Sequence, residues 1–166
     1  MKYRWNKTYN SDSFMQAQID YDNADIVHQK VDLPLSYDYA LLSTLKRSMD
    51  TYNLLNLSVP FERTELLNEI PLAPYRSSTK QISVLKWLVF GRIHWFLNIK
   101  SQPESRRDSK RKVEQIVDFL IERNENCLII GHGVRLGLLV KKLISKGFKG
   151  SYIRDPRNGI PYTYQK

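Results

Sequence analysis

Residues 126–148 read NCLIIGHGVRLGLLVKKLISKGF and combine a short apolar run, a glycine-flanked histidine and a helical pattern. The run at 127–130 has the length of a buried strand. The apolar residues after it recur at the spacing of one helix face: Leu136, Leu139, Val140 and Leu143. The pattern predicts strand, turn and helix, with His132 at the turn. In open α/β sheets this junction binds ligands, and a helix N-terminus there favours an anion.

Glycines flank this histidine on both sides, at Gly131 and Gly133. Glycine tolerates a sharp turn and lets a ligand approach the backbone closely, so we expect both glycines to serve the turn. A lone Gly-His-Gly is equally compatible with a histidine that only satisfies a turn. The assignment therefore depends on the rest of the chain.

The composition is that of a basic, globular protein. The 166 residues are enough for one domain with a core, and 42% hydrophobic content argues against disorder. Lys and Arg number 26 against 17 acidic residues, and a net charge of +9 suits anionic partners or solvated helix faces. The single cysteine, Cys127, excludes an internal disulfide and favours a reducing, cytoplasmic location. No apolar segment follows Met1, so we expect no signal peptide.

Helical and strand patterns alternate along the chain in an α/β order. We expect residues 1–10 to be too short for a strand and its turn, and a tail at 152–166 with a hairpin at Asn158-Gly159. The expected elements are a helix over 11–24 that begins at Ser11-Asp12-Ser13, a strand over 38–42, a helix to about residue 55, a strand over 59–63, a helix through 113–121, the strand at 127–130 and its helix.

Residues 82–98, ISVLKWLVFGRIHWFLN, are apolar almost all round. Charged residues interrupt them, so they fall short of the roughly 20 clean apolar residues of a membrane span. We expect a buried or cap-forming helix, with peripheral membrane contact from Trp87 to Phe96 as the alternative. The basic run from Lys100 to Lys112 would by itself also suit a linker or a nucleic-acid patch.

Four ordered segments of the chain are similar to motifs of one known family. Residues 42–51 are similar to SSPLKRAxQT, residues 66–70 to LxEI, the stretch from Glu104-Ser105 into the next helix to GES…RV, and residues 126–139 to VLVVSHGGVIRALL. In this order they resemble the histidine phosphatase (phosphoglycerate mutase-like) superfamily. The resemblance implies a single domain over 1–166, built as a three-layer α/β/α sandwich with a mostly parallel sheet. It places a cap at 73–101.

The resemblance also implies roles for individual residues. Arg47 and His132 would bind the phosphoryl group beside Gly133, and Glu69 would protonate the leaving group. An arginine fork pairs with two phosphate oxygens, and a carboxylic acid can supply the proton. Glu65 competes with Glu69 for that role. No cofactor is implied, and no Cys/His spacing indicates a metal site.

One family feature is missing from this sequence. The family's first strand ends in Arg-His-Gly, whose histidine becomes phosphorylated, and no such tripeptide occurs here. The nearest match, at Arg4-Trp5-Asn6, would put an indole without a basic lone pair in that place. We expect the chain to begin after that strand, and we expect neither His28 nor His94 to replace the nucleophile. Loss of a central strand predicts lower stability, strand exchange or a homo-oligomer.

Three functions follow in order of preference. The first is a phosphomonoester hydrolase that acts through phosphohistidine on a phosphorylated small molecule or phosphoprotein, shortened or impaired in this chain. The second is a catalytically inactive phosphate-binding module. The third is a basic protein that binds nucleic acid or a membrane surface. This function would account for the positive charge of the chain but not for the four motifs, so we do not expect a nucleic-acid partner.

Overall fold

The computed structural model describes residues 7–26, 31, 33, 36–152 and 157–166. The chain forms two compact units, one from residues 1–25 and 70–109 and the other from residues 26–69 and 110–166. We call them the first unit and the second unit. Helix α4 (Arg106–Arg123) begins in the first unit and continues in the second.

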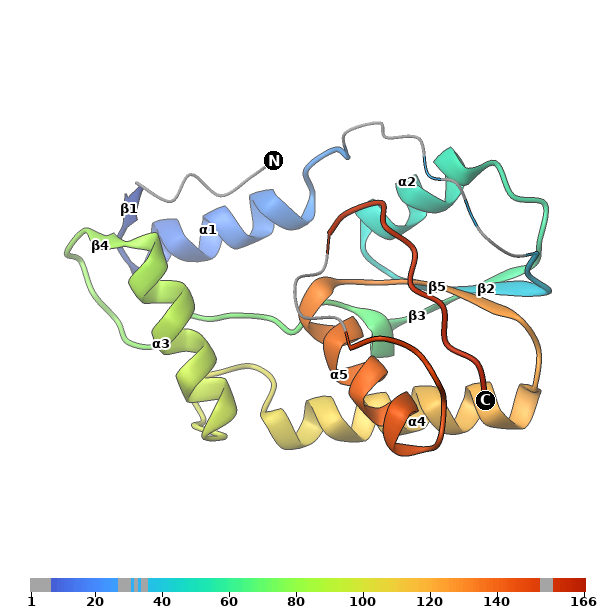
Figure 1. The fold of residues 1–166 in the computed structure, drawn as a ribbon. Coiled ribbons are helices and arrows are strands. Elements are labelled where there is room, and N and C mark those ends of the chain that lie inside the picture. The colour runs from blue at the N-terminus through green and yellow to red at the C-terminus, as the bar shows by residue number, and fades with distance from the viewer. Residues whose placement is uncertain (1–6, 27–30, 32, 34–35, 153–156) are drawn as a thin grey trace. The chain divides into compact units, whose positions relative to one another are not determined.

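A parallel sheet of three strands forms the centre of the second unit (Figure 1). Strand β2 (Tyr39–Ser43) lies between β3 (Phe61–Thr64) and β5 (Cys127–Ile130) and is parallel to both. All five residues of β2 are buried. A strand covered on both faces is expected to be continuously apolar rather than alternating, which is why YALLS forms the central strand.

Alternate side chains of β2 enter two different cores. Tyr39 and Leu41 pack in one cluster with residues of α4 and α5 (Gly133–Ser145), whereas Ala40 and Leu42 pack in another with Tyr52 of α2 (Lys46–Leu55). Figure 1 accordingly shows α2 on one face of the sheet and α5 on the other. This layering confirms the predicted α/β class with a parallel sheet.

The predicted strands and helices of the second unit are present with small shifts in their ends. A short 3₁₀ helix, η1 (Glu65–Leu67), follows β3. In the tail, Gly159 turns with φ 72°, and the pairing in the described part of the tail is one bridge, Lys149 to Gln165. Residues 153–156, which would form the first arm of the hairpin predicted at Asn158-Gly159, lie outside the described residues, so the hairpin stays a prediction.

The first unit begins with a strand that the sequence patterns did not predict. Strand β1 (Thr8–Tyr9) pairs antiparallel with β4 (Ile82–Ser83). The prediction that residues 1–10 are too short for a strand was wrong because the partner lies more than 70 residues away, so no local turn is needed. Helix α1 (Ser11–Asp22) starts at the expected residue, but its N-cap is Asn10 rather than one of the serines, because the Asn10 side chain accepts the Ser13 N–H at 2.8 Å.

Helix α3 (Val84–Phe96) is buried on one side only. Trp87 stacks on Phe14 at 5.5 Å between ring centroids, and its Nε1–H donates to the Tyr9 carbonyl at 2.9 Å. Trp95 donates to the Ser109 hydroxyl at 3.0 Å. Both tryptophans are thus core residues, and neither is exposed enough to serve the alternative of peripheral membrane contact. Among the described helices none is long and apolar enough to span a membrane.

Candidate phosphate-binding site

His132 lies where β5 ends and α5 begins, as the sequence predicted. It is the N-cap residue of α5, with extended backbone at φ −119° and ψ 153°. Its Nε2 atom is 2.9 Å from the Ser43 hydroxyl and 3.4 Å from the Ser48 hydroxyl. Ser43 ends β2, and Ser48 lies in the first turn of α2. The ends of two adjacent parallel strands therefore bring these three side chains together.

The glycines beside His132 serve packing rather than an unusual backbone. Within the described residues the glycines with positive φ are Gly147 and Gly159, not Gly131 or Gly133. A Cβ atom on Gly131 would lie 3.3 Å from a Leu136 methyl carbon and 3.4 Å from the Leu67 carbonyl oxygen. Gly131 thus allows close approach of the neighbouring chain, and the expectation of a glycine-dependent sharp turn is wrong.

The imidazole of His132 is neutral at physiological pH. The side chain is only 8% exposed. Burial, together with the positive charges of Arg47 and Arg135, lowers the pKa of His132 from 6.5 to about 4. A neutral imidazole beside two guanidinium groups at a helix N-terminus is a set of groups suited to a phosphate dianion.

Arg135, like Ser43 and Ser48, is a residue of this cluster that the sequence analysis missed. It is completely buried, and its Nε–H donates to the Asn68 carbonyl at 3.0 Å. A local signal existed, because Arg135 precedes Leu139 by four residues and so lies on the apolar face of the helix. A charged residue on a buried helix face needs a partner, and that requirement marks the position.

The segments after β2 and η1 are joined by hydrogen bonds. The Asn68 side-chain oxygen accepts from the Thr44 N–H at 2.9 Å, and its amide nitrogen donates to the Thr44 hydroxyl at 2.8 Å. This contact holds the chain just before Arg47 and just before Glu69. Arg47 lies in the first turn of α2, near enough to lower the pKa of His132.

The proposed acid and its competitor differ in their surroundings. Glu69 is partly buried and follows Asn68 directly, whereas Glu65 is exposed at the start of η1. The structure therefore brings His132, Ser43 and Ser48 into contact and places Arg47 beside them. The chemical role of Glu69 stays a prediction.

Of the other two histidines, the structure describes His94 alone. His28 lies outside the described residues. His94 belongs to α3 in the first unit, where its Nδ1 atom is 2.7 Å from the Ser101 hydroxyl. In the described parts of the chain, no group of three or more His, Cys, Asp or Glu side chains is placed to hold a metal ion.

Comparison with known proteins identifies the family. The family model of the histidine phosphatase superfamily (branch 1) matches residues 22–155, well over half of the chain. No curated protein matches the sequence.

Three solved structures are similar to this chain to different degrees. A candidate alpha-ribazole-5'-P phosphatase from Escherichia coli is 23% identical with a TM-score of 0.52, covering 67% of this chain and 58% of its own. The chain thus spans a little over half the length of that structure. The open reading frame Rv3214 product of Mycobacterium tuberculosis is 17% identical with a TM-score of 0.46, covering 81% of this chain and 63% of its own. A phosphoserine phosphatase from Entamoeba histolytica is 15% identical with a TM-score of 0.45, covering 80% and 63%. From the family match, this chain belongs to branch 1 of the histidine phosphatase superfamily.

Proposed function

We propose that the chain is a phosphomonoester hydrolase of the histidine phosphatase type, with its phosphate site where β2 and β5 end. The observation that supports this most directly is His132, a buried, neutral imidazole at a helix N-terminus with Arg47 and Arg135 close enough to depress its pKa. Its substrate would be a phosphorylated small molecule or a phosphoprotein.

The chemistry of phosphoryl transfer explains these residue types. Charge spreads over the equatorial oxygens in the transition state, so positioned donors and cations stabilise it. Arg47 supplies a fork that pairs with two oxygens. The backbone N–H groups at the start of α5, from Gly133 onward, supply further donors.

The hydroxyl of Ser43 selects one tautomer of His132 in this proposal. Ser43 Oγ accepts the Leu45 N–H at 3.0 Å, so its own proton is available to His132 Nε2 at 2.9 Å. Nδ1 then carries the ring proton. A bound phosphate dianion would raise the pKa of His132, because an opposite charge favours the imidazolium.

Glu69 is proposed as the acid that protonates the departing oxygen. A carboxylic acid is a residue type that can donate a proton to a departing oxygen. Its position directly after Asn68, which the Thr44 contacts hold in place, supports its choice over the exposed Glu65.

A second candidate function, a phosphate-binding module without turnover, is favoured by one observation. The sequence contains no Arg-His-Gly tripeptide to supply the histidine that attacks phosphorus in this family. Arg47 and His132 would then bind phosphate while no covalent phosphohistidine forms.

One set of variants tests both candidates. We would measure hydrolysis of p-nitrophenyl phosphate and, by calorimetry, binding of inorganic phosphate for the wild type, Arg47→Ala and His132→Ala. Lys141→Ala is the matched control, because this residue is exposed on α5. Hydrolysis lost in both site variants and kept in the control supports the hydrolase. Phosphate binding that depends on Arg47 and His132 without hydrolysis supports the module, and absence of both refutes the proposed site.

A further inference from the structure

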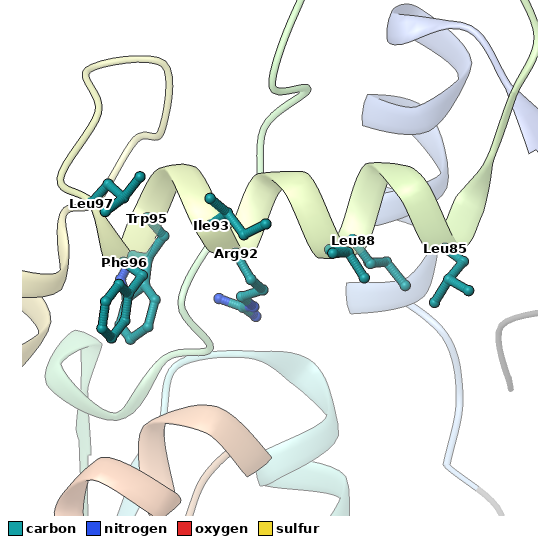
Figure 2. A pocket seen from close by; sticks show the side chains of 8 residues that line it. Leu85, Leu88, Arg92, Ile93, Trp95, Phe96 and Leu97 are labelled. Carbon is teal, nitrogen blue, oxygen red and sulfur yellow. The ribbon is translucent and has the colours of Figure 1, made fainter.

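The outward side of α3 is apolar along its whole length. Leu85, Val89, Ile93 and Phe96 follow one another at helical spacing and are 52%, 46%, 42% and 53% exposed. We call these four residues with Leu88 and Leu97 the α3 apolar face. Figure 2 shows the labelled side chains of Leu85, Leu88 and Phe96 projecting from the helix on the same side. The opposite side of α3 is buried in the core of the first unit, so the exposed face is additional to that core.

The α3 apolar face is contiguous along the helix. With Arg92 and Trp95 it lines a shallow groove of about 620 Å³. Monomeric soluble proteins rarely expose large contiguous apolar patches without an interaction that uses them. A polar helix face would be expected here if water were its only neighbour.

The charged residues of the segment that carries this face are mostly basic. Residues 70–109 contain seven Lys and Arg but two acidic residues. Both acids are engaged within the unit: Glu104 is buried and accepts from the Ser109 hydroxyl at 2.5 Å, and Asp108 accepts from the Ser105 hydroxyl at 2.6 Å as α4 begins. The outward charge of this segment is therefore basic.

Basic side chains lie at the end of the apolar face itself. The Arg106 guanidinium is 4.3 Å from the centre of the Phe96 ring. The Arg107 N–H donates to the Asn98 side chain at 3.0 Å, which holds the start of α4 against the loop that leaves α3. Lys100, in that loop, is exposed. Apolar and basic groups are thus adjacent in one ordered segment of the first unit.

We propose that the α3 apolar face docks on an anionic lipid surface. Apolar side chains from a helix in the interface plane enter the boundary of the acyl chains, and flanking Lys and Arg bind anionic headgroups. Each basic residue near such a surface contributes about 1 kcal/mol. This inference concerns the first unit and is independent of the proposed phosphate site.

The same charges disfavour the other occupants of this face. A second copy related by a two-fold axis would bring identical basic residues together and would meet like-charge repulsion. Nucleic acid would attract the basic residues but would leave the apolar centre of the face against a charged phosphate backbone. An anionic membrane surface complements both the apolar centre and the basic fringe.

The test uses the full chain and vesicles of defined composition. We would measure sedimentation with vesicles of phosphatidylcholine alone and of phosphatidylcholine with phosphatidylserine, at low and high salt. Binding is expected to the anionic vesicles and to weaken with salt. Val89→Gln with Ile93→Gln should reduce the partition coefficient by about tenfold or more. Met15→Gln with Ile19→Gln is the matched control, since both residues are about half exposed on α1.

A charge reversal tests the basic fringe separately. Lys100→Glu with Arg107→Glu should abolish the preference for anionic vesicles, whereas Lys141→Glu with Lys166→Glu, at exposed positions of the second unit, should leave most of it. Circular dichroism would verify that each variant folds. Absence of binding to either vesicle type overturns the proposal, as does a dimer in solution that the Val89/Ile93 variant dissociates. Hydrolysis of p-nitrophenyl phosphate measures the function of the phosphate site independently of vesicle binding. Failure of the membrane-docking proposal can therefore be distinguished from failure of the proposed hydrolase function.

Discussion

Acidification should destabilise the folded chain through His132. The pKa of His132 falls from 6.5 to about 4 on folding, because burial and two neighbouring guanidinium groups disfavour the imidazolium. The unfolded chain therefore binds a proton at a pH where the folded chain does not. The stability associated with this group is complete above pH 6.5 and is lost as pH falls toward 4.

The size of the effect follows from the two pKa values of His132. The full difference corresponds to about 3 kcal/mol in the free energy of unfolding. Between pH 7 and pH 5 the imidazole should account for about 2 kcal/mol of that loss. A difference of this size is a large fraction of the stability of a small domain and is readily measured.

Urea unfolding at several pH values would measure the effect, with His132→Gln as the reference. Glutamine retains hydrogen-bonding capacity but cannot take up the proton, so the other titrating groups cancel when the two pH profiles are subtracted. An NMR titration of the His132 ring protons would give the pKa directly and does not depend on the stability of the variant. This account of a buried imidazole beside two cations would be refuted by two results together. The free energy of unfolding would depend on pH in the same way in the wild type and in His132→Gln, and the NMR titration midpoint of His132 would lie near 6.5.

Three further perturbations have expected outcomes. Gly137→Ala should raise the free energy of unfolding by about 0.5–1 kcal/mol, because the new methyl group meets no atom within 4 Å and alanine favours the helix. Gly91→Ala should raise the free energy of unfolding less, because its methyl group would collide with the side chain of Leu72. Urea unfolding of both variants would measure the difference. Ile116→Val should lower the melting temperature through the loss of about 1 kcal/mol, since this side chain is 1% exposed in the core beneath the sheet, and calorimetry would detect it. If the chain hydrolyses phosphate monoesters, Glu69→Gln should lower kcat by about 10²–10⁴-fold, while Glu65→Gln should leave kcat unchanged; the reverse result would reassign the acid.

Local patterns were sufficient to predict most elements of the second unit. The apolar run at 127–130 and the spaced leucines after it are short-range features, and β5 and α5 lie where they indicated. The same patterns placed His132 at the turn between them. They failed for β1, because pairing with β4 depends on a partner that no local pattern identifies.

Helix α3 shows how far composition can predict burial. Its mixture of aromatic and aliphatic residues indicated a helix correctly, but not which side would be covered. Trp87 and Trp95 face the core while Phe96 faces outward, although all are suited to a membrane interface. Periodicity could not distinguish them, because a helix that is apolar on every side has no amphipathic direction.

The sequence by itself determined the α/β class, the position of His132 between a strand and a helix, and the basic charge of the chain, since each depends on neighbouring residues or on composition. Only the tertiary structure decided which side chains meet at that turn. Ser43 lies 89 residues before His132 yet is 2.9 Å from its ring, because β2 and β5 are adjacent and parallel. Arg135 belongs to the site because the packing of α5 brings its guanidinium group to the backbone carbonyl of Asn68, which follows η1. Such contacts depend on strand order and on packing of both sheet faces, and these are settled when the whole core forms.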